Sequence, residues 1–290
     1  MIDNKFLILK KINDLKTTYT FLFLFLGFNL FSQLEDKIKS TKNNPNEMLK
    51  QAYQLFKEGN DKASVKLANE VLKIGEETKN DTLVGKALTS LCRNSQRNQD
   101  TVTLLELSNK LIELSNSTGD KQWTMYQAHM NAEMWRLIGN MDKAEAYYNQ
   151  SMIISNEIGA KGMYMIDHFN KSFVSTAKGD FKSARNLIIK YYELRKEMNS
   201  NLDDAYGLIA LAYLLEKEDK FEEAHEVCVV TRRLFKEQNI FPEPPDEKPL
   251  LMVEKEVKNK LDEKLLIIIN KKSEYETVQS LLKKHLNYLD

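Results

Sequence analysis

The hexapeptide GNMDKA at residues 139–144 returns at a spacing of 40 as GDFKSA at residues 179–184 and as DKFEEA at residues 219–224. Each copy begins with a residue that tolerates a tight turn and ends with alanine. Five small residues precede these hexapeptides or their weaker counterparts at the same spacing: Ala52, Cys92, Ala132, Ser172 and Ala212. A strict period of this length is typical of a stacked array of one supersecondary unit, not of a globular enzyme core.

Each unit is predicted to be a helix, a tight turn and a second helix. In residues 121–160 we expect helices over 123–138 and 142–158, joined by a turn at Gly139. Glycine after the last helical turn adopts the left-handed cap conformation without steric cost. The whole chain has only ten glycines and five prolines, as a mostly helical fold requires. The predicted units are 41–80, 81–120, 121–160, 161–200 and 201–240.

The small residues have a packing explanation. Ala132 in a first helix and Ala144 in the following second helix are expected to face each other where the two backbones approach closely. Neither helix can bury its apolar stripe alone, so each hairpin depends on its neighbours. The second unit is the most degenerate, because Gln99 and Leu104 stand where other units have glycine and alanine.

These hexapeptides, with the small residues before them, resemble the tetratricopeptide repeat (TPR) family. The resemblance covers residues 41–240, about two thirds of the chain. It implies an all-α fold, an α-solenoid of about five TPR-like helical hairpins. The usual repeat in that family is ~34 residues, so a period of 40 implies that each helix is longer by most of a turn. Longer variants of this kind resemble the helical sensor and scaffold arrays of bacterial signalling proteins.

The N-terminal residues do not follow the repeat. Several lysines precede an apolar run from Tyr19 to Phe31, and Ser32 follows it. Thirteen residues suit the apolar region of a secretory signal peptide and fall short of the ~20 needed to cross a bilayer. We therefore expect a signal peptide over residues 1–32 and export to the periplasm or beyond, with no stable membrane span in the mature chain. An uncleaved N-terminal membrane anchor and a buried helix are the alternatives.

The remaining segments flank the array. Residues 33–44 are expected to be a linker or an N-terminal cap, and the five repeats then occupy residues 45–240. Residues 241–290 break the period and are expected to form a proline-rich connector followed by an atypical capping hairpin. Ser273 and Glu276 look like a capping box before the last helix. Apolar residues at helical spacing precede them: Leu250, Val253, Val257, Leu261, Leu265 and Ile268.

Composition and spacing argue against catalysis. The 42 basic and 42 acidic residues balance, so no overall field favours nucleic acid or an acidic membrane. Cys92 and Cys228 lie about three units apart, too far for a disulfide whose Cα atoms must be within ~7 Å, and we expect two buried free thiols. We find no catalytic constellation and no phosphate loop, and we expect neither a cofactor nor a metal. His129 and Glu133 could make a weak metal pair, but a hydrogen-bonded surface pair is favoured.

The inner face of the first helices, which lines the concave groove in the TPR family, is the candidate partner-binding surface. Basic groups beside aromatic rings can hold an extended or helical peptide, with arginine on a carboxylate and the rings on an apolar side chain. In the alternative interpretation, the arginines pair with nearby acidic residues and the aromatic rings pack between units. For the rings, we favour this alternative. The candidate residues are Tyr53, Arg93, Arg97, His129, Glu133, Arg136, Phe173 and Tyr213.

One known binding mode of the family is not matched. Its carboxylate-clamp members grip a peptide C-terminus with paired asparagines and lysines, and Tyr53 stands where an asparagine would be needed in the first unit. The function predicted from the sequence is therefore a non-catalytic, exported scaffold for a protein or peptide partner, without nucleic acid. Two alternatives stay open: a sensor or regulatory protein working with a separate kinase or transcription factor, and a structural subunit of an envelope assembly.

Overall fold

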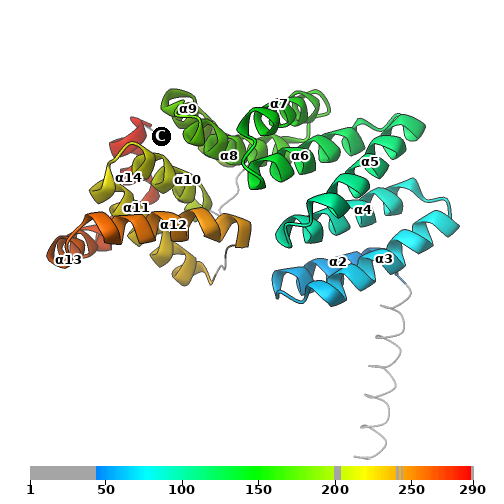
Figure 1. Cartoon of the computed structure of the whole chain (residues 1–290), viewed down its shortest axis with the longest axis horizontal. Coiled ribbons are helices and arrows are strands. Elements are labelled where there is room, and N and C mark those ends of the chain that lie inside the picture. Colours follow the sequence, from blue (N-terminus) through cyan, green and yellow to red (C-terminus); the bar gives the residue numbers. More distant parts are fainter. Residues whose placement is uncertain (1–43, 199–203, 240–241, 243, 289–290) are drawn as a thin grey trace, which may run out of the picture.

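The computed structural model describes residues 44–198, 204–239, 242 and 244–288, and all regular structure within these ranges is helical (Figure 1). No helix in these parts of the chain is long and apolar enough to cross a membrane. The predicted signal peptide at 1–32 lies outside the described residues, and so does the predicted linker or cap at 33–44 except for Asn44, which caps the first described helix. The helices are α2 (Pro45–Lys57), α3 (Asp61–Glu77), α4 (Asp81–Arg97), α5 (Thr101–Thr118), α6 (Lys121–Leu137), α7 (Met141–Glu157), α8 (Lys161–Ala177), α9 (Phe181–Glu197), α10 (Asp204–Lys217), α11 (Phe221–Gln238), α12 (Pro244–Lys260), α13 (Glu263–Lys272) and α14 (Val278–Leu286), with a short 3-10 helix η1 (Ser273–Tyr275).

The helices form a solenoid of five hairpins. Helices α2 and α3 make the first unit, and the pairs α4–α5, α6–α7, α8–α9 and α10–α11 make the next four (Figure 1). Each helix packs against its neighbour in the chain, and each first helix also contacts the first helix of the next unit. The first helices therefore line one continuous side of the array, and the prediction of an all-α, TPR-like solenoid is confirmed.

The period of 40 contains an inner period of 20. From α2 to the end of α11, one residue in each described turn has a positive φ, both within hairpins and between them. The residue that follows usually caps the next helix by accepting a backbone N–H bond on its side chain, as Asn60, Asn140 and Asp180 do. Most helices of the array thus begin and end by the same local rule, and α8 and α11 begin without a side-chain cap. The positive-φ residues are Gly59, Lys79, Gln99, Gly119, Gly139, Gly159, Gly179, Asp219 and Asn239.

The small residues lie where the helices are in closest contact. All five, from Ala52 to Ala212, are fully buried. Ala132 and Ala144 belong to one buried cluster with Tyr148, so the expected contact within the third hairpin is confirmed. Cys92 and Cys228 are buried and unbridged, as the sequence predicts. Burial raises the pKa of the Cys92 thiol to about 12, which makes it unreactive at neutral pH.

The C-terminal segment differs in detail from the prediction. Helix α12 already begins at Pro244, because proline suits the first turn of a helix, and it contains Pro249. It packs on α10 and α11 in the way a first helix of a sixth unit would. The expected apolar face is interrupted, since α12 ends at Lys260 and Ile268 of α13 is 48% exposed.

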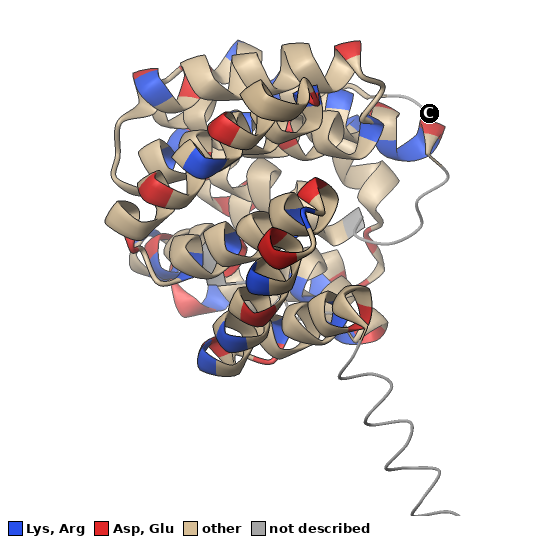
Figure 2. Ribbon diagram, turned by 90° about the vertical axis from the view of Figure 1, so that its right-hand side faces the viewer, with Lys and Arg blue, Asp and Glu red and all other residues tan. Residues whose placement is uncertain are grey.

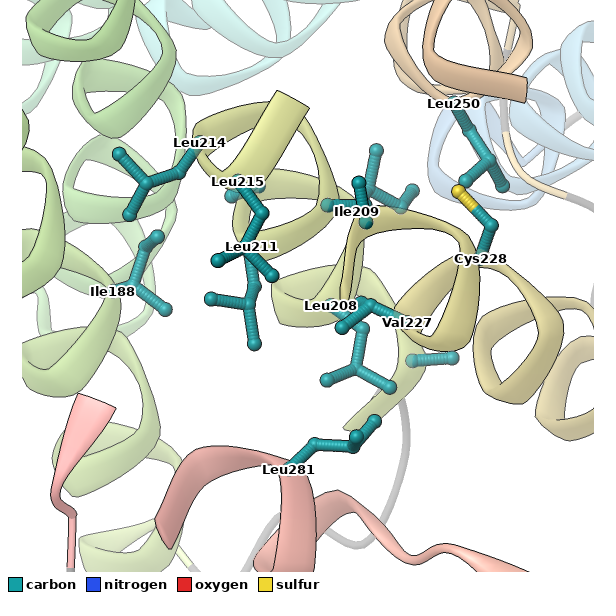
Figure 3. Close-up of a cluster of buried hydrophobic side chains, with 14 of the residues drawn as sticks. Ile188, Leu208, Ile209, Leu211, Leu214, Leu215, Val227, Cys228, Leu250 and Leu281 are labelled. Atoms are coloured by element: carbon teal, nitrogen blue, oxygen red, sulfur yellow. The ribbon is translucent and has the colours of Figure 1, made fainter. Parts of the chain in front are cut away.

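Helices α13 and α14 return to α11 and α10 instead of extending the array. Helix α14 adds Leu281 to the same buried cluster as Leu208 and Val227 (Figure 3). Its capping box consists of Thr277 and Ser280, and the predicted box at Ser273 and Glu276 is wrong. Ser273 is buried instead, and its hydroxyl donates to the carbonyl of Ile269.

The α13–α14 segment is held by arginines that bind backbone carbonyls. Arg233 of α11 donates to the carbonyls of Ser273, Glu274 and Glu276. Arg185 of α9 donates to the carbonyl of His285 at 2.8 Å. These bonds satisfy acceptors that the ends of α13 and α14 leave without helical partners.

We expect Gln99→Gly to stabilise the array. Gln99 has φ 55°, and a side chain in this region costs roughly 1 kcal/mol relative to glycine. Urea unfolding should therefore show a gain of about 1 kcal/mol. Gly139→Ala should lose about as much through backbone strain alone, because a Cβ there would meet nothing within 4 Å.

Gln99→Ala is the matched control, since it removes the side chain but keeps a Cβ at positive φ. A gain from Gln99→Ala equal to that from Gln99→Gly would show that the glutamine side chain, not the backbone conformation, limits stability.

Candidate functional site

The concave side of the array contains a central pocket of about 400 Å³. Residues from α2, α4, α6, α8 and α10 line it, with one residue each from α9 and α12. All but these last two come from first helices, as the sequence predicts for a groove. The lining residues are Tyr53, Phe56, Arg93, Gln96, Tyr126, His129, Met130, Glu133, Met163, Met165, Ile166, Phe169, Asn170, Tyr191, Tyr206 and Asp246.

A second cavity of about 360 Å³, called the basic pocket below, adjoins the central one between α2, α4 and α6. The two share Tyr53, Arg93 and Tyr126, so they form one continuous groove. Among the described residues that line the basic pocket, none is acidic. They are Asn46, Leu49, Lys50, Tyr53, Lys86, Thr89, Ser90, Arg93, Gln122, Trp123 and Tyr126.

Arg93 and Tyr53 meet where the two cavities join. The guanidinium carbon of Arg93 lies 5.0 Å from the centre of the Tyr53 ring, a cation–π contact between α4 and α2. Lys57 places its ammonium 5.2 Å from the same ring. Within the described part of the chain, the Arg93 side chain has no hydrogen bond or ion pair, and Tyr53 is 42% exposed. The structure therefore brings these two predicted residues together with their polar groups available.

Arg97, in contrast, holds the first two units together. It forms an ion pair with Asp61 at 3.0 Å, donates to the carbonyl of Phe56 and stacks 3.4 Å above the Phe56 ring. Its side chain is buried, and it does not line either cavity. The structure therefore places this predicted groove residue in the contact between the first and second units, not in the groove lining.

Glu133 is the centre of a buried polar network. It is 2% exposed and accepts hydrogen bonds from Gln96 of α4, Arg136 of its own helix and the Tyr148 hydroxyl of α7. In the Arg136–Glu133 ion pair, the nitrogen and oxygen atoms are 2.6 Å apart. Arg136 thus pairs with a nearby acidic residue, as the alternative interpretation of the arginines expects. A buried carboxylate is tolerated only when it is satisfied in this way.

His129 does not pair with Glu133 on the surface, so that expectation is wrong. Both side chains are buried, and Nδ1 of His129 lies 2.6 Å from Oδ1 of the fully buried Asp167. Burial alone would lower the pKa of His129, but the facing Asp167 carboxylate outweighs it and raises the pKa. The pair joins α6 to α8. The sequence alone did not identify Asp167, because its partner His129 lies on another helix. The alignment of α6 with α8 is the signal that would have placed the two residues side by side.

Phe173 and Tyr213 belong to the packing between units. Phe173 is 5% exposed, and its ring centre lies 5.7 Å from that of Tyr213. The guanidinium of Arg136 lies 5.8 Å from the Phe173 ring. None of these three lines either cavity, which favours packing over partner contact. In their place the groove presents residues that were not predicted, such as Tyr126 and Asn170. Tyr126 is three residues from His129 on the same helical face.

Comparison with known proteins adds little to this geometry. No protein-family model matches the sequence, and no curated protein matches it either. Among solved structures, a tetratricopeptide repeat protein from Parabacteroides merdae is similar at 11% identity, covering 79% of this chain and 98% of its own, with a TM-score of 0.32. So remote a likeness carries no argument about function. The array itself is TPR-like. That description follows from its five hairpins and their continuous row of first helices.

The His129–Asp167 pair predicts a pH dependence of stability. Because the folded state raises the pKa of His129, the stabilisation is complete below the ordinary pKa of about 6.5 and is lost as pH rises through the folded-state pKa. In urea unfolding, the free energy of unfolding of wild type should exceed that of His129→Gln by the largest amount at low pH. The gap should shrink by about 1.4 kcal/mol for each unit of pKa shift.

His225→Gln is the matched control, because burial lowers the pKa of His225 and its effect has the opposite sign. A gap between wild type and His129→Gln that stays constant from mildly acidic to alkaline pH would contradict the charged pair.

Proposed function

We propose that this protein is a non-catalytic scaffold that binds a protein or peptide partner in the groove formed by its central and basic pockets. The observation that carries the proposal is Arg93, a cation without a described ionic partner, set beside the exposed ring of Tyr53 in a cavity. A TPR-like array offers a protein-interaction surface of this kind. The polar groups of the groove then select the partner, while the rest of the array is scaffold.

The contrast with the neighbouring arginines supports a binding role for Arg93. Arg97 and Arg136 are both engaged in ion pairs, one with Asp61 and the other with Glu133 of its own helix. Arg93 forms no ion pair with a described residue, and its cation–π contact with Tyr53 leaves its guanidinium N–H groups without a described acceptor. A guanidinium without a protein acceptor can form bidentate hydrogen bonds to a carboxylate brought by a partner.

We expect Arg93→Ala and Tyr53→Ala to weaken partner capture by ~10-fold or more, the usual cost of removing an arginine or aromatic anchor. The full chain, tagged and expressed in its native host, is the bait, and quantitative mass spectrometry measures the captured proteins. The melting temperature should stay near that of wild type for these two variants. Arg97→Ala should lower it, because Asp61 then loses its ion-pair partner and the Phe56 ring loses the guanidinium stacked on it.

Lys110→Ala is the control, since Lys110 is exposed on the second helix α5, away from the groove. Unchanged capture by an Arg93→Ala/Tyr53→Ala double variant would refute the groove as the binding surface.

We also propose that the protein is exported. The support is the run from Tyr19 to Phe31 with lysines before it and Ser32 after it. N-terminal sequencing of protein purified from the native host should begin at Gln33. Protein that retains Met1 would contradict cleavage and favour the N-terminal anchor.

A further inference from the structure

We infer that the groove takes an acidic peptide segment, with side-chain carboxylates in the basic pocket and an apolar side chain in the central pocket. The inference rests on the proposed function and specifies its partner. It depends on the distribution of charge between the two cavities.

The basic pocket has an excess of unneutralised positive charge. Arg93 and Lys86 line it, and neither forms an ion pair with a described residue. Lys50 does pair, with Glu47 at 2.7 Å, but both side chains are exposed, and pairs of this kind contribute little and exchange readily. Lys57 adds a further ammonium at the Tyr53 ring. An acidic side chain of a partner would meet these cations without displacing any buried acid.

This local excess does not reflect the composition of the chain. Basic and acidic residues are equal in number over the whole sequence, and on the face shown in Figure 2 the two signs are interspersed along the helices. The cations of the basic pocket are also set in a concave surface. Concave, low-dielectric walls concentrate the field and strengthen attraction for an anion.

The central pocket has the opposite character. The buried side chains of Glu133 and His129 in its lining already have partners, since Glu133 pairs with Arg136 and His129 with Asp167. Between them the lining is largely apolar, with Met130, Met163, Met165, Ile166 and Phe169. Methionine side chains adapt their shape to different apolar groups. This pocket is suited to an aliphatic or aromatic side chain and not to a second charge.

The two cavities also give the bound segment a direction. They meet at Arg93 and Tyr53, so an acidic residue and an apolar residue a few positions apart can occupy both at once. Asp246 lies at the α12 end of the central pocket. The cations lie at the opposite end, so an acidic residue of the partner is favoured at the end formed by α2 and α4.

A displayed library of random peptides of about a dozen residues tests this directly. Fixed sequences at both ends of each peptide exclude a free terminal carboxylate, so that selection reports side chains alone. Panning on the immobilised full chain should enrich peptides in which Asp or Glu lies within a few positions of an aliphatic or aromatic residue. Selected peptides, synthesised with blocked ends, should bind more weakly as salt is raised.

Charge reversal supplies the matched variants. In the double variant Lys86→Glu/Arg93→Glu, affinity for the selected acidic peptides should fall on the order of 100-fold, because like charges then face each other. A new selection of peptides on this variant should enrich Lys and Arg in place of Asp and Glu. Lys66→Glu/Lys110→Glu changes the net charge equally at two exposed positions on second helices and should leave the selection unchanged.

The outcomes separate the inference from the proposed function. Peptides that depend on Tyr53 but show no preference for Asp or Glu would overturn the acidic partner and keep the groove. Stronger binding of a single-stranded oligonucleotide than of any selected peptide, lost in Lys86→Glu/Arg93→Glu, would also overturn it. Peptides whose binding is unaffected by Tyr53→Ala and by the charge reversal would count against the groove itself.

Discussion

The left-handed turn residue that recurs at a spacing of 20 sets the length of helices α3 to α8. Because the turns that bound these helices have the same conformation and most are followed by a capping side chain, the helices run back and forth at nearly constant length. Constant length places the small residues of each hairpin opposite one another. Those contacts let the backbones approach, and the close approach aligns the first helices into one groove.

The middle of the array contains a network of buried polar contacts between helices. Glu133 links α4, α6 and α7, and the His129–Asp167 pair links α6 and α8, whereas the last units bury a large cluster of aliphatic and aromatic side chains, part of which Figure 3 shows. Charges buried in this way add little net stability but penalise any other alignment of the helices. The central pocket lies over this network, so its floor is both polar and fixed in position.

The sequence was a good guide to local structure and a poorer one to contacts between helices. The turns at Gly139 and Gly179 could be predicted because glycine has a direct conformational reason to be there, while Lys79 gives no such signal although its backbone is the same. For the candidate site, the structure places Arg93 in the groove lining but Arg97 in a contact between the first two units. Four residues rotate a helical side chain by ~40° and move it ~6 Å along the axis, which is enough to carry Arg97 from the groove to the interface with Phe56.

The C-terminal helices decide how far the groove extends. Helix α12 takes the position of a sixth first helix, so it covers the apolar side of α10 and α11 and adds Asp246 to the lining of the central pocket. Helices α13 and α14 do not pair with α12 as a second helix would, because Arg233 and Arg185 hold them against α11 and α9. The groove is therefore asymmetric, with cations beside α2 and α4 and a carboxylate beside α12. An array built from nearly identical turns acquires a direction in this way, and a directional groove can distinguish the two orientations of a bound chain.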